Sequence, residues 1–126
     1  MKKIINTSNA PAPFGPYSQA VLVHNTLYIS GQIAIHPPTG ELMLSNIKSE
    51  TQQVMENIKA ILNEAGMNFE NVVKCSIFIS DMNNFGNINE VYGTYFSGNY
   101  PARETVQVAR LPKDVNVEIS VVAVFD

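Results

Sequence analysis

The segment VNVEISVVAV, residues 115–124, alternates between two kinds of position. Successive side chains of a β-strand point to opposite faces of the sheet, so the odd-numbered residues share one apolar face. The even-numbered face is mixed and carries Asn116, Glu118, Ser120, Val122 and Val124. We predict a strand over residues 116–124 that buries its odd face beneath helices.

The mixed face of this strand also bears on assembly. A sheet face that is half apolar and left open often packs against another subunit. The pattern therefore favours an oligomer, with a partly exposed sheet in a monomer as the alternative.

Two helical patterns lie upstream. Between about Asn46 and Ala65 apolar residues recur mostly every third or fourth position, which predicts an amphipathic helix. Ser45 is a plausible N-cap and Gly66 a plausible stop. A second helix is expected from about Asn84 to Phe96. Further strands are expected over residues 3–6, 17–23, 27–30, 72–79 and 103–109, with Gly31 interrupting the third.

The expected order is β-β-β-α-β-α-β-β. Helices separated by strands in this way predict an α+β fold, with one mixed sheet and both helices on one face. The length of 126 residues fits a single domain spanning residues 1–126.

Composition narrows the function classes. The formal net charge of −3 and the lack of a basic run disfavour nucleic-acid binding. The single cysteine, Cys75, allows no intrachain disulfide, and its apolar neighbours predict a packed thiol. There is no signal-peptide core and no apolar segment of ~20 residues, so no membrane association and a cytoplasmic location are expected.

Common catalytic and cofactor motifs are absent. The chain has no glycine-rich phosphate loop and no nucleophile elbow. Its two histidines, His24 and His36, fall in a turn and a proline-rich loop without metal-ligand spacing, so no metal is expected.

Two charged residues remain as candidates. Arg103 opens a predicted strand after Pro101-Ala102, and its planar guanidinium suits a carboxylate ligand. Glu118 lies among valines and isoleucines, where a carboxylate is costly unless it is paired or useful. The residue chemistry alone leaves alternatives open: a strand-end arginine, a stabilising pair of the two, or a solvent-facing glutamate.

The segment from Pro101 to Ile119 resembles the signature of the Rid family, the reactive intermediate deaminases, also called the YjgF family. Other segments are similar to the remaining motifs of that family and cover essentially the whole chain, with the RidA branch the most similar. They are Asn9-Ala10-Pro11, Gly15 to Ala20, Ile29 to Ile33, Pro38-Thr39-Gly40, Asn57 to Leu62, Ala65-Gly66, Asp81 to Phe85, Asn89, and Ala109 to Asp114.

This resemblance implies a chorismate-mutase-like α+β fold that assembles as a homotrimer, with three sites in the clefts between subunits. It implies hydrolysis of 2-imino acids, the enamine/imine products of pyridoxal-phosphate enzymes, to 2-oxo acids and ammonia. No cofactor is implied, because an iminium carbon is already electrophilic.

The resemblance also implies roles for individual residues. Arg103 would bind the substrate carboxylate, and Glu118 would position a water and relay protons. The backbone groups of Gly31 and Thr105 would fix the carboxylate and the imine nitrogen. The other site residues implied are Tyr17, Ser30 and Asn89, with Phe85 as an apolar wall.

Two positions depart from the usual pattern of the family. Glu104 follows the arginine where a small or apolar residue is common. In a regular strand it points away from Arg103, whereas in a bulged strand it would compete for that cation. Thr105 stands where several members carry cysteine, which excludes a thiol-dependent role there.

Three classes of function are open at this point. They are an imine deaminase, a non-catalytic module that binds small carboxylates or metabolites, and an RNA-directed activity. The acidic balance disfavours the third.

Overall fold

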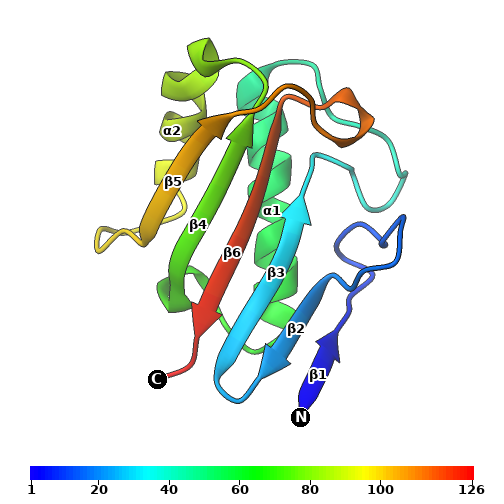
Figure 1. Cartoon of the computed structure of the whole chain (residues 1–126), viewed down its shortest axis with the longest axis vertical. Helices are drawn as coiled ribbons and strands as arrows, with labels where there is room; N and C mark the ends of the chain where they lie inside the picture. Colours follow the sequence, from blue (N-terminus) through cyan, green and yellow to red (C-terminus); the bar gives the residue numbers. More distant parts are fainter.

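The computed structural model describes residues 1–126 and contains one six-stranded sheet and two α-helices (Figure 1). The helices are α1 (Ile47–Glu64) and α2 (Phe85–Gly93). The strands are β1 (Lys2–Ile5), β2 (Ala20–Val23), β3 (Thr26–Gln32), β4 (Val72–Ile79), β5 (Ala102–Gln107) and β6 (Val117–Val124). This confirms the predicted α+β class and the order of the eight elements.

The strands lie side by side in the order β1-β2-β3-β6-β4-β5. β4 and β5 run parallel, and every other neighbouring pair is antiparallel. The last strand of the chain therefore lies at the centre of the sheet, between β3 and β4.

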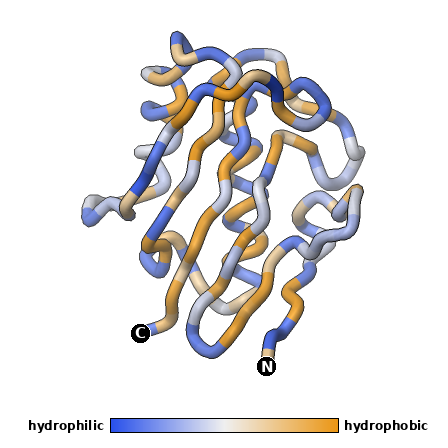
Figure 2. Tube along the Cα trace, viewed as in Figure 1, coloured by the Kyte–Doolittle hydropathy of each residue, from blue (hydrophilic) through white to orange (hydrophobic).

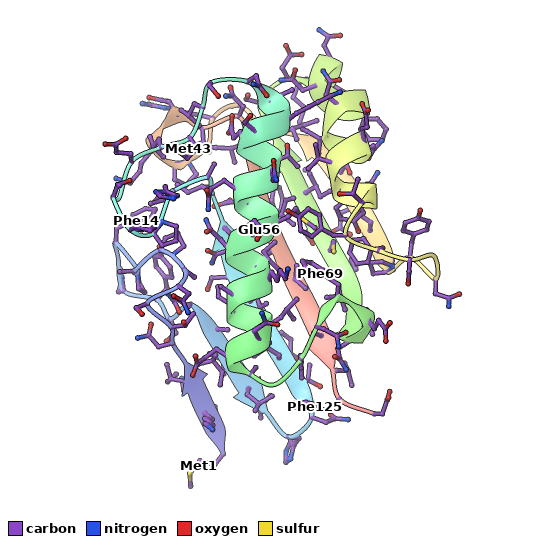
Figure 3. The ribbon with its side chains drawn as sticks, turned by 180° about the vertical axis from the view of Figure 1, so that it is seen from behind. Met1, Phe14, Met43, Glu56, Phe69 and Phe125 are labelled. Carbon is purple, nitrogen blue, oxygen red and sulfur yellow. The ribbon has the colours of Figure 1, made fainter.

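Both helices cover the same face of the sheet, as the view from behind shows (Figure 3). On β6 the side chains of Val117, Ile119, Val121 and Ala123 are buried towards the helices, as predicted. The alternation of hydropathy along the central strands is visible in Figure 2. The opposite face has no element over it and is called the open face below.

The N-cap of α1 is one residue later than expected. Asn46, not Ser45, has the extended backbone of a cap, and its Oδ1 accepts a hydrogen bond of 2.8 Å from the Ser49 amide. The predicted stop at Gly66 is correct. Its φ of +76° is a left-handed conformation that glycine adopts without a side-chain clash.

α2 is shorter than the predicted helix over residues 84–96. It ends at Gly93, because the next amides bond three residues back, from Tyr95 to Tyr92 and from Phe96 to Gly93. This tighter turn lets Tyr95 and Phe96 still pack against the core.

Three strand boundaries differ from the prediction by two or three residues, and the others agree to within one residue. β2 begins at Ala20, which leaves Tyr17 in a loop, and β5 ends at Gln107. Gly31 does not end β3; the strand continues to Gln32 with a shift of register against β6 between Ile29 and Gln32.

A fully buried carboxylate joins α1 to β6. Glu50 accepts hydrogen bonds from the backbone amides of Asn116 and Val117 and from the side chain of Asn116, at 2.7, 3.2 and 2.7 Å. These bonds fix the start of the strand that carries Glu118.

Neither α-helix has the length and apolar character needed to cross a bilayer.

Candidate functional site

Arg103 lies on the face of β5 that is turned towards the helices. It is paired in register with Cys75, which is buried on the same side. Its Nη1 donates a hydrogen bond of 2.7 Å to Oδ1 of Asn89 on α2. None of the ion pairs of the chain involves Arg103, so its charge is available to an anionic ligand.

Two aromatic rings of α2 contact the same guanidinium. Its Cζ lies 5.0 Å from the ring centroid of Tyr92 and 5.6 Å from that of Phe85. These distances are those of cation–π contacts. A hollow of about 300 Å³ opens beside Arg103 and is lined by Asn89, Tyr92, Gly93, Tyr100 and Pro101. Together, Arg103, Asn89, Phe85 and Tyr92 are called the arginine cluster.

The start of the α2 region is tied to the strand that carries the arginine. The Met82 amide donates a hydrogen bond of 2.8 Å to Oε1 of Gln107, at the end of β5. Asp81 caps the short turn that leads into α2, through a bond of 2.9 Å from the Asn83 amide. The helix is thereby held over the arginine.

Thr105 follows two residues along β5, on the same face as Arg103. Its hydroxyl oxygen is buried and has no hydrogen-bond partner. A buried polar atom without a partner is uncommon, and this one lies on the face of β5 that carries the guanidinium.

Glu104 does not compete for Arg103, because β5 is regular and the two side chains point to opposite faces. On the open face, Glu104 accepts a hydrogen bond from the hydroxyl of Ser76 and forms an ion pair of 3.0 Å with Lys74. The hydroxyl and the ammonium hold the pKa of Glu104 below its usual range. The bulged alternative is therefore wrong.

Glu118 lies half-buried on the open face, opposite Phe78 of β4. Burial raises the pKa of its carboxyl group. Its carboxylate packs directly against Gly31, where a Cβ atom would lie 2.8 Å from Cδ and 2.9 Å from Oε2 of Glu118. A side chain at this position would displace the carboxylate of Glu118 from its observed place.

Ser30 and Tyr17 belong to the same region as Glu118. Ser30 Oγ donates a hydrogen bond of 2.6 Å to the Ser18 carbonyl, which fixes the loop after Tyr17 to β3. Tyr17 is exposed, and its hydroxyl accepts a hydrogen bond of 3.3 Å from the Phe14 amide. We call Glu118, Gly31, Ser30 and Tyr17 the glutamate cluster.

One chain does not bring the two clusters together. β5 and β6 are separated by β4, which places them about 10 Å apart across the sheet. Along β4, Arg103 is level with Cys75 and Glu118 with Phe78, and the two side chains leave opposite faces. A site that uses both residues therefore needs a second copy of the chain.

Sequence analysis did not predict the contact between Tyr92 and Arg103. The contact could have been predicted from the spacing, because Phe85, Asn89 and Tyr92 stand at i, i+4 and i+7 and so form one stripe of α2.

The buried role of Gln19 was also missed. It is buried, accepts from the Thr7 amide at 2.8 Å and donates to three carbonyls of the N-terminal loop.

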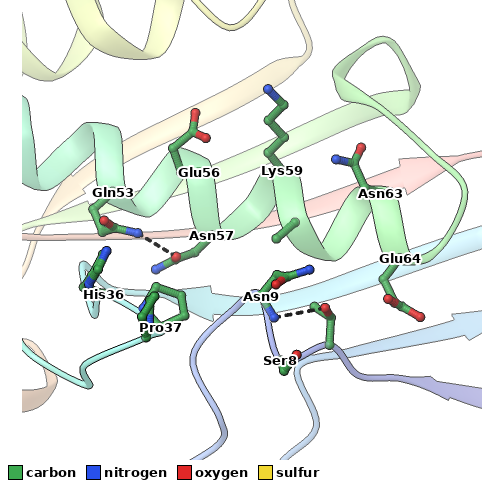
Figure 4. A pocket seen from close by; sticks show the side chains of 13 residues that line it. Ser8, Asn9, His36, Pro37, Gln53, Glu56, Asn57, Lys59, Asn63 and Glu64 are labelled. Carbon is green, nitrogen blue, oxygen red and sulfur yellow. Dashed lines mark hydrogen bonds between the residues drawn. The ribbon is translucent and has the colours of Figure 1, made fainter.

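A separate polar groove of about 580 Å³ lies between α1 and the loops at residues 7–9 and 36–38 (Figure 4). Its buried amide, Asn57, is fully engaged with Gln53 and with the carbonyls of Ile33 and Ile35. Glu56 and Lys59 point away from the loops (Figure 4). No three acidic, cysteine or histidine side chains of the chain are grouped to hold a metal ion.

Comparison with known proteins gives the family. A family model described as Endoribonuclease L-PSP matches residues 7–125. A protein of Rattus norvegicus named 2-iminobutanoate/2-iminopropanoate deaminase is 49% identical over 124 residues, which cover 98% of this chain and 90% of the relative. The chain belongs to the Rid family.

Other members of the Rid family are similarly close. A RutC family protein of Pyrococcus horikoshii is 53% identical over 98% of each chain. The crystal structure of E. coli TdcF with bound serine has a TM-score of 0.95 and 43% identity, over 98% of this chain and 99% of that one. The fold and the family expected from the sequence motifs are thereby confirmed.

Proposed function

We propose that this Rid protein hydrolyses reactive 2-imino acids to 2-oxo acids and ammonia. Two copies of the chain would form each site, one supplying the arginine cluster and the other the glutamate cluster. The observation that carries the proposal is the unpaired Arg103 guanidinium, held by α2 beside an open hollow. The names of the mammalian relatives, at 46–49% identity, support the same reaction.

Arg103 is suited to the carboxylate of an imino acid. Its Asn89 contact takes up one N–H group, which leaves the remaining donors of the guanidinium for a ligand. A bidentate pair of this kind fixes the orientation of the substrate as well as its charge. The serine bound to the TdcF relative is an amino acid of comparable size.

Glu118 would carry out the proton transfers. The carboxylate takes a proton from a water molecule as the water oxygen bonds to the carbon of the C=N group, and the carboxyl group then gives that proton to the nitrogen. The carboxylate then takes the hydroxyl proton of the resulting carbinolamine and passes it to the amino group, so that the C–N bond breaks, ammonia leaves and the ketone forms. The raised pKa of Glu118 makes it a stronger base than an ordinary glutamate once it is ionised.

The half-apolar open face provides the surface for the second copy. Tyr28 and Val106 are exposed on it, and Val122 and Val124 are partly exposed. Packing this face against another copy would cover the apolar side chains and place Glu118 in an interface. We propose a homotrimer, the assembly implied by the family motifs.

The first experiment measures the chemistry. Threonine dehydratase generates 2-iminobutanoate, and the purified Rid protein is added while imine decay and 2-oxobutanoate formation are followed. Acceleration by the wild type, lost in Arg103→Ala, is the expected result. No acceleration by the wild type would contradict the deaminase proposal.

A second experiment tests the shared site. Arg103→Ala and Glu118→Gln are each expected to be inactive, and the two variants are then unfolded and refolded as a mixture. Random co-assembly restores an intact arginine–glutamate pair in about a quarter of the sites between subunits. A mixture as inactive as its components, despite proven co-assembly, would rule out a site built from two copies.

The same preparations separate the other two classes. A non-catalytic module would bind a small carboxylate such as 2-oxobutanoate through Arg103 without accelerating imine decay. An RNA-directed activity would cleave a labelled RNA independently of Arg103.

The proposal also includes a cytoplasmic location, where pyridoxal-phosphate enzymes release such imines. Cell fractionation tests this location.

A further inference from the structure

We propose that Tyr92 is a positioning residue: the face of the Tyr92 ring holds the guanidinium of Arg103 in the orientation that binds a ligand. The family motifs quoted in the sequence analysis do not include Tyr92. The inference rests on the proposed function only for its kinetic test, and its spectroscopic test is independent of any activity.

The geometry places Arg103 on a stripe of α2. Phe85, Asn89 and Tyr92 occupy successive turns of one helix face, and all three contact the same guanidinium. Tyr92 makes the closer of the two aromatic contacts, at 5.0 Å against 5.6 Å for Phe85. Tyr92 is also 4% exposed, whereas Phe85 is 38% exposed, so Tyr92 is the fixed member of the pair.

The ring of Tyr92, rather than its hydroxyl, carries this role. The hydroxyl oxygen is buried from solvent and has no hydrogen-bond partner in good geometry. Burial, and then the neighbouring Cys75 thiol, raise the pKa of the phenol far above its usual range, so it stays neutral. A neutral, inaccessible hydroxyl neither pairs with Arg103 nor reaches a ligand in the hollow.

An arginine without an ion pair needs such a support. Its long side chain has several rotamers, and ordering it when a ligand binds costs conformational entropy. The single hydrogen bond to Asn89 fixes one nitrogen, and the ring face restricts the plane of the guanidinium. Preorganisation of this kind raises affinity without adding a contact to the ligand.

The sequence offers a direct spectroscopic test. Arg103 and Arg110 are the only two arginines, so the Nε–Hε region of a nitrogen–proton NMR spectrum contains two side-chain signals. Arg110 pairs at the surface with Asp114, at 2.5 Å, and serves as the internal reference. We expect the Arg103 signal of the wild type, assigned with Arg103→Lys, to be shifted by the aromatic ring current.

Two substitutions of Tyr92 separate the role of the aromatic ring from that of the hydroxyl group. Tyr92→Phe should keep the shifted Arg103 signal, and Tyr92→Leu should return it towards the position of a free arginine, with the Arg110 signal unchanged in both. In the imine assay, Tyr92→Leu should raise KM by about 3- to 30-fold with a smaller change in kcat, the size expected for a lost cation–π contact. Tyr92→Phe should restore the wild-type KM.

Three results would overturn the proposal. The first is a wild-type Arg103 signal without a ring-current shift, which requires no variant to fold. The second is a folded Tyr92→Leu protein with the wild-type signal and KM. The third is a Tyr92→Phe protein as impaired as Tyr92→Leu, which would assign the role to the hydroxyl. If Tyr92→Leu loses the shifted Arg103 signal of the wild type but the wild type hydrolyses no imine, the proposed function fails and the positioning role of Tyr92 stands.

Discussion

At the scale of single residues, neighbours in the chain have separate tasks because β-strand side chains alternate between faces. Arg103 faces α2 and stays free of ion pairs, while Glu104 faces away and is satisfied by Lys74 and Ser76. A glutamate directly after the arginine is therefore compatible with a free guanidinium. The same alternation places Glu118 on the open face between two buried residues, Val117 and Ile119.

Glu118→Gln is expected to abolish imine hydrolysis and to increase thermal stability at neutral pH. Because burial raises the folded-state pKa of Glu118 above its ordinary value of 4.5, the ionised form is disfavoured in the folded protein. Wild-type stability is therefore lost as the pH rises through that raised pKa, whereas glutamine does not titrate. Calorimetry at pH 4 and pH 7 should find a larger gain in Tm at pH 7, and an equal gain at both would contradict the argument.

Gly31→Ala is expected to lower kcat/KM by about 10- to 100-fold, since small displacements of a catalytic group have effects of this size. The new Cβ would lie 2.8 Å from Cδ of Glu118 and would displace the carboxylate. Gly86→Ala is the matched control, because a Cβ at Gly86 of α2 meets no atom within 4 Å. Equal kinetics of the two variants would show that the position of the carboxylate does not depend on Gly31.

At the scale of elements, α1 and α2 each organise one side of the candidate site. α2 carries the three side chains that contact Arg103, and the bond from Met82 to Gln107 ties its start to β5. α1 does not touch Glu118 but holds the beginning of β6 through Glu50. α2 thus orients Arg103, and α1 fixes the start of the strand that carries Glu118.

Glu50→Ala is expected to lower the free energy of unfolding by about 2–4 kcal/mol. The substitution leaves two backbone amides and one side-chain amide at the start of β6 without their acceptor. Glu64→Ala, at the exposed end of α1, should change stability by less than about 0.5 kcal/mol. Urea unfolding of both variants measures the difference, and a loss at Glu50 as small as at Glu64 would refute the role of the buried carboxylate.

At the scale of the whole molecule, the sheet has one face covered by helices and one face open (Figures 1 and 3). The arginine cluster and the glutamate cluster lie on opposite faces, with β4 between β5 and β6. The two halves of the proposed site therefore lie at different places on the surface of one chain. The proposal requires assembly of two copies to bring them together.

Val122→Glu is expected to dissociate the proposed trimer and to abolish imine hydrolysis without unfolding the chain. Val122 is partly exposed on the open face, where a carboxylate is tolerated in a monomer but not in an apolar interface. Gln52→Glu makes the same charge change on the exposed side of α1 and should leave the assembly intact. Light scattering gives the mass of each variant, and a trimeric, active Val122→Glu protein would exclude the open face as the interface.

The sequence predicted most of the fold because its patterns are local. The alternation along residues 115–124 and the helical spacing before Gly66 depend on neighbours in the chain, and both were confirmed. The boundaries at Asn46, Ala20 and Gly93 were missed, since they depend on single hydrogen bonds that compete with equally plausible caps and turns.

The sequence by itself determined the α+β class, the alternating strands and the candidate residues Arg103 and Glu118. Only the tertiary structure decided which groups contact them: Tyr92 and Asn89 around the arginine, Gly31 against the glutamate, and Lys74 and Ser76 on Glu104. The reason is physical. Periodicity along a chain fixes which face a side chain takes, whereas its partners come from strands and helices that only the order of the sheet brings together.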